Sequence, residues 1–172
     1  MQNHWFPLEK HSILWDNFPM KTGTLCLVTN GEKILLGMKK EGFGAGRWNG
    51  FGGKVKDGET LESAALRELH EEAGLTAEPS ALDRAAVLTF HFSGNPEWQV
   101  HVFRVARWVG ESHETKEMRP EWHDLNTIPY AQMWEADRHW LPLVLAGKRI
   151  EADVFYQDFQ NDILKDFRWR DL

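Results

Sequence analysis

The sequence predicts a single domain of the α/β class, in the α+β sense, with helices packed on a mixed β-sheet. The chain has 172 residues, 42% of them hydrophobic, which suits one hydrophobic core and not two. Segments typical of strands and segments typical of helices are interspersed along the chain. They lack the regular strand–helix–strand alternation of a parallel sheet, so a mixed sheet is expected.

The first elements are an N-terminal extension and a hairpin. Residues 1–21 are mixed and aromatic, and we expect them to pack as an extension on a domain formed by residues 22–172. Residues 24–29 are rich in β-forming side chains. The following Asn30-Gly31 is a strong turn signal, which predicts pairing with a second strand over residues 33–38.

A glycine-rich segment and a helix come next. Residues 39–53 contain six glycines, so this segment cannot be regular throughout. Residues 60–73 have a helical composition, with Leu61, Ala65 and Leu69 on one stripe. Gly74 is well placed to end this helix as the residue just beyond its last turn.

The second half of the chain predicts two strands, a helix and a late strand. The strands are expected over residues 85–92 and 99–108, joined by a loop at residues 93–96. A helix is expected over residues 130–145, after Ile128-Pro129, and a final strand over residues 151–159.

Charge and hydrophobicity disfavour a long nucleic acid or a membrane as a partner. The net charge of −6 disfavours a long nucleic acid, which usually needs a basic face. We find no signal peptide and no apolar run long enough to span a membrane. The only cysteine, Cys26, lies in an apolar segment and is expected to be a core residue. We therefore expect a cytoplasmic monomer that acts on a small molecule.

Three carboxylates gather near the end of the predicted helix, in Arg67-Glu68-Leu69-His70-Glu71-Glu72. Glu68 and Glu72 lie one helical turn apart with Glu71 beside them, and like charges at this spacing repel. A bound divalent cation would replace this repulsion with attraction, because each carboxylate would then face a positive charge. Mg²⁺ prefers carboxylate and phosphate oxygens. The alternative is a solvated acidic helix face, which is common in proteins.

The spacing around these carboxylates resembles the signature of the Nudix hydrolase family. Gly53 is followed after five residues by Glu59, and after seven more by Arg67-Glu68-Leu69-His70-Glu71-Glu72-Ala73-Gly74-Leu75, so every fixed position is met. The resemblance implies a mixed sheet sandwiched between helices and a Mg²⁺-dependent hydrolase of nucleoside triphosphates, with Mn²⁺ as the alternative metal.

The resemblance also implies roles for individual residues. The metal would be held by Gly52, Glu68, Glu71, Glu72 and Glu117. One of the glutamates would activate water, and which one stays open. Arg67 would orient the glutamates, and Glu59 would brace the joint between loop and helix.

Residues 36–55, with 100–103, 117–120 and 160–164, resemble a narrower branch of the family, the oxidised purine nucleoside triphosphatases. This resemblance implies a purine pocket in which Trp134 stacks on the base. The implied pocket residues are Thr24, Lys39, Phe43, Asn49, Phe90, Phe92, Trp134 and Asp137. Core packing, or a turn position for Asn49, would explain the same residues without a ligand.

The chain departs from that branch beside the expected stacking tryptophan. It reads Trp134-Glu135-Ala136-Asp137, so alanine replaces the first of two adjacent aspartates. We expect Asp137 to read the base edge without a like-charged partner, and therefore a narrower substrate range. The preferred base stays open.

The function expected from these residues is hydrolysis of oxidised purine (deoxy)nucleoside triphosphates such as 8-oxo-dGTP to the monophosphate and pyrophosphate, which sanitises the nucleotide pool. The alternatives within the family are hydrolysis of another modified purine triphosphate or of a dinucleoside polyphosphate. A non-catalytic nucleotide sensor is a further alternative, although Glu68, Glu71 and Glu72 are all retained. Residues 1–21 could also dock a partner protein.

Overall fold

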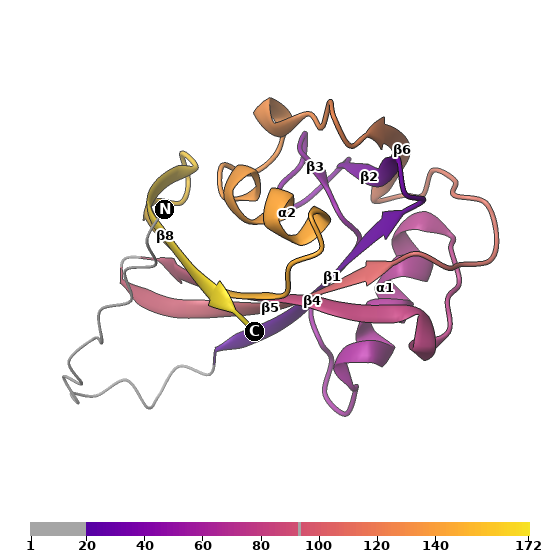
Figure 1. Cartoon of the computed structure of the whole chain (residues 1–172), viewed down its shortest axis with the longest axis horizontal. Helices are drawn as coiled ribbons and strands as arrows, with labels where there is room; N and C mark the ends of the chain where they lie inside the picture. Colours follow the sequence, from indigo (N-terminus) through magenta and orange to yellow (C-terminus); the bar gives the residue numbers. More distant parts are fainter. Residues whose placement is uncertain (1–19, 93) are drawn as a thin grey trace.

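The computed structural model describes residues 20–92 and 94–172, which form one mixed sheet of eight strands (Figure 1). The strand order is β3-β2-β1-β5-β4-β7-β8, and β6 pairs with β2 beside this path. The strands are β1 (Lys21–Thr29), β2 (Lys33–Lys39), β3 (Trp48–Asn49), β4 (Leu82–Phe92), β5 (Asn95–Val105), β6 (Met118–Asp124), β7 (Ile150–Asp158) and β8 (Ile163–Asp171).

Two of the strand pairs are parallel and the others are antiparallel, so the expected mixed sheet is confirmed. β1 runs parallel to β5, and β4 runs parallel to β7. The turn after Asn30 joins β1 and β2 as an antiparallel hairpin, as predicted. The extension expected over residues 1–21 lies almost wholly outside the described residues, and Lys21 already belongs to β1.

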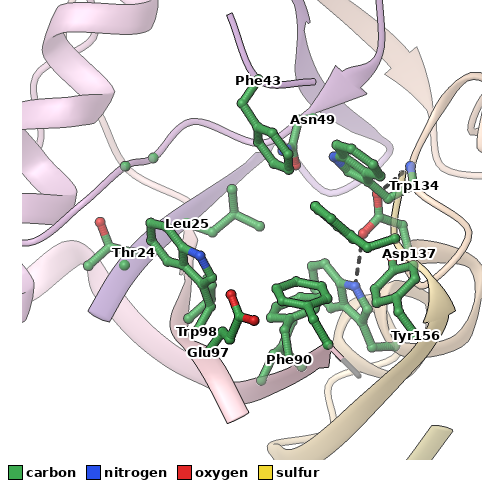
Figure 2. Close-up of a pocket in the computed structure, with 18 of the residues that line it drawn as sticks. Thr24, Leu25, Phe43, Asn49, Phe90, Glu97, Trp98, Trp134, Asp137 and Tyr156 are labelled. Carbon is green, nitrogen blue, oxygen red and sulfur yellow. Dashed lines mark hydrogen bonds between the residues drawn. The ribbon is translucent and has the colours of Figure 1, made fainter. Parts of the chain in front are cut away.

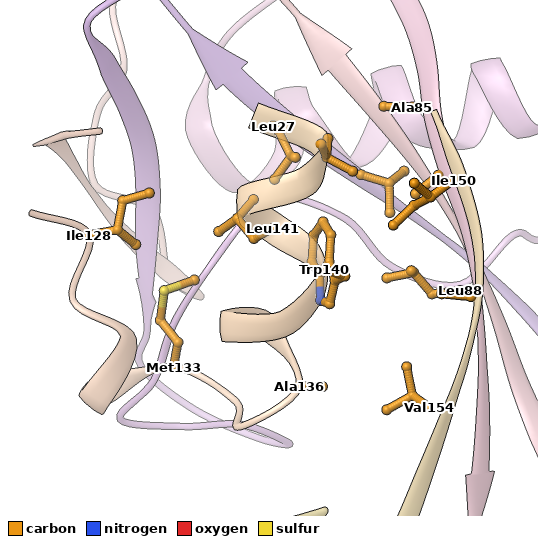
Figure 3. Packing of buried hydrophobic residues seen from close by; sticks show 14 of the residues in the cluster. Leu27, Ala85, Leu88, Ile128, Met133, Ala136, Trp140, Leu141, Ile150 and Val154 are labelled. Carbon is orange, nitrogen blue, oxygen red and sulfur yellow. The ribbon is translucent and has the colours of Figure 1, made fainter. Parts of the chain in front are cut away.

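The two α-helices cover opposite faces of the sheet. α1 (Leu61–Ala73) packs on a core that includes Cys26 and Val28 of β1, whereas α2 (Asp137–Leu145) packs on a core that includes Leu27. Alternate side chains of a strand point to opposite faces, so these assignments place one helix on each side. Figure 3 shows α2 packed against the strands through its buried side chains. The expected helix–sheet–helix sandwich is confirmed.

Helix α1 begins and ends where its sequence signals predict. The Thr60 hydroxyl oxygen accepts a hydrogen bond from the backbone N–H of Ser63, and the Ser63 hydroxyl oxygen accepts one from the backbone N–H of Thr60. This reciprocal cap satisfies two donors at the helix start. Gly74 adopts a left-handed conformation with φ 73°, and its N–H donates to the carbonyl of His70. Residues next to each end of this helix, which carries the carboxylates, therefore determine where it begins and ends.

The helix expected over residues 130–145 is wrong in its first half. A short 3₁₀ helix, η2 (Tyr130–Gln132), ends at Met133, where the backbone is extended, and α2 begins only at Asp137. Trp134 therefore lies in the irregular segment between the two helices.

Several strand boundaries also differ from the expected ones. The loop expected at residues 93–96 is shorter, because β5 begins at Asn95, and β5 ends at Val105 instead of residue 108. A register irregularity after Phe90 accommodates Pro96 within the hairpin. β6 and β8 and the 3₁₀ helix η1 (Pro79–Ala81) were not predicted. Across residues 20–92 and 94–172, each helix falls short of the length and apolarity needed to cross a membrane.

Candidate functional site

The glycine-rich loop after β3 is pressed between β1 and α1. The carbonyl of Gly53 accepts a hydrogen bond from the N–H of Thr24 at 2.9 Å. A Cβ on Gly52 would stand 2.0 Å from the Thr24 carbonyl oxygen, and one on Gly53 would stand 2.6 Å from Glu68 Oε1. At Gly52 the clash would be with backbone, so only glycine permits this approach, whereas a Cβ at Gly53 would displace the Glu68 side chain. The loop backbone is thereby held beside the carboxylates of α1.

Arg67 binds three of the carboxylates in this region. Its Nε and Nη2 donate to the two carboxylate oxygens of Glu59 at 2.6 and 3.0 Å. Its Nη1 donates to Glu68 at 2.6 Å and to Glu71 at 3.1 Å. The hydrogen bonds from Arg67 are the main reason that the pKa of Glu59 falls to about 2. Arg67 therefore links Glu59, Glu68 and Glu71 through hydrogen bonds.

Glu72 is the buried member of the acidic group, at 3% exposure. Its Oε2 accepts a hydrogen bond from the N–H of Gly52 at 2.9 Å, and its Oε1 accepts one from Lys39 Nζ at 3.2 Å. Burial raises its pKa to about 7, with a smaller contribution from the negative charge of Glu68, while the contacts with Gly52 and Lys39 act in the opposite direction. Glu72 is therefore poised between its charged and neutral forms near neutral pH.

Lys39 lies between two carboxylates, those of Glu72 and Glu117, to which the family resemblance gives a metal-binding role. Its ammonium lies 3.2 Å from Glu72 and 2.9 Å from Glu117. An ammonium bridging two carboxylates shows that this corner accommodates a positive charge. Among the described residues, no group of three or more Asp, Glu, His or Cys side chains is arranged so that it could hold a metal ion as it stands. Arg67 and Lys39 instead neutralise the carboxylates, whose oxygens are the ligand type that hard divalent cations prefer.

Two adjoining cavities lie beside this acidic region. The larger has a volume of about 710 Å³ and a mostly apolar lining with eight aromatic residues, and the smaller has about 660 Å³ and includes Lys39, Glu72 and Glu117 in its lining. The residues that line both cavities are Phe43, Asn49, Gly52, Trp98 and Trp134. The two cavities together offer an aromatic compartment that opens onto a charged one.

The larger cavity collects most of the residues that the sequence assigns to a base pocket (Figure 2). The predicted residues that line it are Thr24, Phe43, Asn49, Phe90, Phe92, Trp134 and Asp137. Lys39 is the exception, because it lines the smaller, charged cavity. Figure 2 shows Phe43 and Asn49 on one side of the space, with Phe90 and Trp98 on the other.

Trp134 forms a flat wall of this cavity. Its ring stacks with Phe43 at a centroid distance of 5.2 Å and with Phe159 at 5.5 Å. The guanidinium carbon of Arg47 lies 4.3 Å from the Trp134 ring centroid. Phe43 is 70% exposed, so it forms part of the mouth of the cavity. Such a wall suits a flat aromatic ligand.

Asp137 is a buried carboxyl group in the cavity lining, at 5% exposure. Its two oxygens accept hydrogen bonds from the N–H of Trp134 at 3.1 Å and from Trp140 Nε1 at 2.9 Å (Figure 2). Burial raises the pKa of Asp137 to about 7, and the charge of Asp162 adds to this shift. The expectation that Asp137 has no like-charged partner is therefore wrong, because a residue far along the chain supplies one.

Sequence reasoning missed several residues of the cavity wall. They include Leu25, Trp98, Tyr156 and Phe159. Trp98 pairs with Phe90 across the β4–β5 hairpin, and Tyr156 shares the alternation of Ala152 and Val154 in β7, so strand periodicity carried a signal for both. Phe159 lies in the turn after β7, where no periodicity applies.

The raised pKa of Asp137 predicts how stability should depend on pH. The folded protein favours the protonated carboxyl, so this stabilisation is complete below the usual pKa of 3.8 and is lost as the pH rises through about 7. Asp137→Asn keeps a neutral group but gives up one of the two acceptors. We therefore expect wild type to have a higher melting temperature than Asp137→Asn at pH 4. This difference should shrink by several degrees as the pH approaches 8, since each kcal/mol corresponds to about 2–4 °C.

Thermal melts of both proteins from pH 4 to 8 would check this prediction. An Asp166→Asn variant, which removes an exposed carboxylate of β8, serves as the control and should show no such trend. A difference between wild type and Asp137→Asn that stays constant over the whole range would contradict the buried, titrating carboxyl group.

Comparisons with known proteins agree with this geometry. The sequence pattern of the NUDIX domain matches residues 19–144. The chain is 52% identical over 133 residues to the "Oxidized purine nucleoside triphosphate hydrolase" of Danio rerio, covering 77% of this chain and 84% of that protein. It is 48% identical over 142 residues to the protein of the same name from Mus musculus, covering 82% and 89%.

The fold has counterparts among solved structures. A MutT protein from Bacillus halodurans superposes with a TM-score of 0.76 at 23% identity, covering 87% of this chain and 97% of that one. At this identity the likeness shows the fold alone. The domain match and the two relatives, together with the glutamate-bearing helix beside its glycine-rich loop, establish that the chain belongs to the NUDIX family.

Proposed function

We propose that this protein hydrolyses oxidised purine (deoxy)nucleoside triphosphates, such as 8-oxo-dGTP, to the monophosphate and pyrophosphate, and so sanitises the nucleotide pool. The observation that carries the proposal is the pair of adjoining cavities, one aromatic and one charged, with a common wall. Their arrangement matches a ligand with a flat base at one end and phosphates at the other. The names of the relatives from Danio rerio and Mus musculus support the same substrate class.

The charged cavity suits a divalent cation, for which we propose Mg²⁺, with Mn²⁺ as the alternative. Gly52, Glu72 and Glu117 line this cavity and would supply the Gly52 carbonyl and two carboxylates. The proposed ligand set also includes the carboxylates of Glu68 and Glu71, which lie outside the lining and bind Arg67. When bound, the cation supplies charge neutralisation for the phosphates and activation of water. Lys39 forms ion pairs with Glu72 and Glu117, and Arg67 forms ion pairs with Glu68 and Glu71.

The residues of α1 would perform the protein's part of the chemistry. Phosphoryl transfer depends mainly on positioning and electrostatic stabilisation. Arg67, anchored on Glu59, holds Glu68 and Glu71 in place. One glutamate of this helix would accept the proton of the attacking water. We propose Glu72 for this role, because its carboxylate is buried and is oriented by the N–H of Gly52 at 2.9 Å.

The residues of the larger cavity would bind the base. Trp134 would stack on the purine, while Asp137 and Asn49 would contact its edge. Asn49 Oδ1 accepts a hydrogen bond from the N–H of Gly50 at 2.9 Å, which fixes the orientation of its amide. Phe90, Phe92 and Thr24 complete the wall, and Lys39 would reach the phosphates from the smaller cavity. We further propose that the protein acts as a cytoplasmic monomer on free nucleotides, since its net charge of −6 disfavours long nucleic acids.

A substrate panel tests the proposal directly. Normal and oxidised purine nucleoside triphosphates and a dinucleoside polyphosphate would be assayed with Mg²⁺, and the products separated by chromatography. We expect the largest kcat/KM with an oxidised purine triphosphate, yielding monophosphate and pyrophosphate. In isotopically labelled water, label found only in orthophosphate would refute the proposed cleavage. A preference for the dinucleoside polyphosphate or for another modified purine would contradict the proposed substrate and support one of the alternative substrates within the family.

A further inference from the structure

Asp162 combines an unusual backbone with a buried charge. Within the described ranges it is the only residue other than glycine with a positive φ, at 56°. It precedes β8 in the turn after β7, and its side chain is only 9% exposed. Its Oδ1 is buried and accepts no hydrogen bond of normal geometry from the described residues, although this carboxylate interacts with the Tyr156 hydroxyl. Left-handed backbone and buried carboxylates both cost stability, so their coincidence at one residue points to a role beyond the turn.

The other oxygen of Asp162 holds the segment that carries Trp134. Its Oδ2 accepts hydrogen bonds from Arg47 Nη1 at 2.9 Å and from the N–H of Glu135 at 3.0 Å. The same Nη1 of Arg47 donates to the carbonyl of Met133 at 2.8 Å. The backbone is thus fixed on both sides of Trp134, and the Arg47 guanidinium lies against the Trp134 ring.

Asp162 also lies close to Asp137. The two carboxylates accept hydrogen bonds from consecutive backbone amides, Asp137 from Trp134 and Asp162 from Glu135. Ala136, between Glu135 and Asp137, is fully buried and contributes no polar side chain. A second carboxylate therefore reaches the neighbourhood of Asp137 from the β7–β8 turn.

We propose that Asp162 is a positioning residue of the base pocket, which fixes the segment carrying Trp134 and places a second negative charge beside Asp137. The inference rests on the proposed function, because it concerns how the base is held. Asp162 does not itself line the cavity, so it acts through its neighbours.

The second charge affects the protonation of Asp137. The titratable and charged groups around Asp137 are Asp162, Arg47, Tyr130 and Tyr156. Burial is the main cause of the raised pKa of Asp137, Asp162 raises it further, and Arg47 lowers it. A protonated carboxyl group donates a hydrogen bond to a base, whereas a carboxylate only accepts one. Asp137 changes from a hydrogen-bond donor to an acceptor when it loses its proton. Removal of the charge at Asp162 should therefore lower the pH at which this change occurs.

Two variants separate the charge of Asp162 from its contacts. In Asp162→Asn, the amide oxygen can keep both hydrogen bonds while the charge is lost, and asparagine tolerates left-handed backbone. In Asp162→Gly, the contacts are lost while the left-handed backbone is accommodated without strain. The control is Asp166→Asn, which removes an exposed carboxylate paired with Arg168 at 2.7 Å in the following strand.

The measurements are calorimetric binding of purine nucleoside monophosphates without metal from pH 5 to 9, and steady-state kinetics with Mg²⁺. We expect Asp162→Asn to shift the pH midpoint of binding downward. We expect Asp162→Gly to raise Kd and KM about tenfold, a change typical of coupled neighbours, while kcat stays within about twofold of wild type. Asp166→Asn should match wild type in each measurement.

Two outcomes would overturn the inference. One is a folded Asp162→Gly variant, judged by its melting curve, that binds as tightly as wild type. The other is an Asp162→Asn variant with an unchanged pH profile. Failure of the proposed function can be distinguished from failure of this inference. If the proposed function is wrong, wild type will show no preference for oxidised purines in the substrate panel. The Asp162 variants can still be tested with any purine monophosphate that wild type binds.

Discussion

Glu72→Gln is expected to slow hydrolysis by at least about a hundredfold to ten-thousandfold, the usual range for loss of a general base, and by more because a proposed metal ligand is lost as well. Glutamine can still accept the hydrogen bond from Gly52 but cannot carry the negative charge. Glu71→Gln should show a loss of several orders of magnitude as well. The measurement is kcat with saturating Mg²⁺ and substrate.

The fold should tolerate Glu72→Gln. The pKa of Glu72 is raised from 4.5 to about 7, so its protonated form stabilises the folded protein below pH 4.5 and this contribution is lost as the pH rises through about 7. A neutral amide should therefore cost little stability above neutral pH. Glu62→Gln, in the exposed first turn of the same helix, is the matched control and should retain full activity. Full turnover by Glu72→Gln in Mg²⁺ would contradict the assignment of this helix.

Trp134→Ala is expected to raise KM for all purine substrates together. Base stacking on an aromatic side chain contributes about 1–3 kcal/mol, which corresponds to about a fivefold to 150-fold change in affinity. Trp134→Phe should recover part of the loss, because a smaller flat ring remains. Trp108→Ala removes a tryptophan that packs on Trp122 in the other core cluster, and it should leave KM unchanged.

The ratio of oxidised to normal substrates separates stacking from reading of the base edge. Trp134→Ala should leave this ratio nearly unchanged, because every purine has the same kind of aromatic face. Asp137→Asn should alter it, because a site built around buried polar groups rejects a ligand that leaves them unpaired. If Asp137→Asn leaves the ratio as in wild type, Asp137 only supports the backbone of Trp134 and the base must be read by another residue.

The part of the site that was predictable from sequence is held together by short-range geometry. The spacing from Gly53 to Leu75 determines a loop, a capped helix and a face of carboxylates, all within one continuous stretch. The hairpin after Asn30 follows from its turn residues in the same way. Such signals can be read from a single sequence because they depend on spacing along the chain, whereas a contact such as that between the N–H of Gly52 and Glu72 spans 20 positions.

The part that was not predictable depends on contacts between distant segments. Asp162 follows Asp137 by 25 positions, and only the turn after β7 brings the two together. β8 was missed because charged residues interrupt its hydrophobic pattern, as expected for a strand at the edge of a sheet. The break before α2 was missed because the extended backbone at Met133 has no proline or glycine to mark it.

The single cysteine has a consequence for how the protein meets oxidants. Cys26 is fully buried on the α1 face of β1, and its Sγ donates to the carbonyl of Ala65 at 3.5 Å. Burial raises the pKa of this thiol to about 12, so almost no thiolate exists at physiological pH. Since the thiolate is the species that peroxides and alkylating agents attack, Cys26 reacts only when the sheet opens. The protein thus lacks an accessible thiol among its described residues, which favours its survival under the oxidative stress that damages nucleotides, and the labelling rate of Cys26 reports how often the core opens.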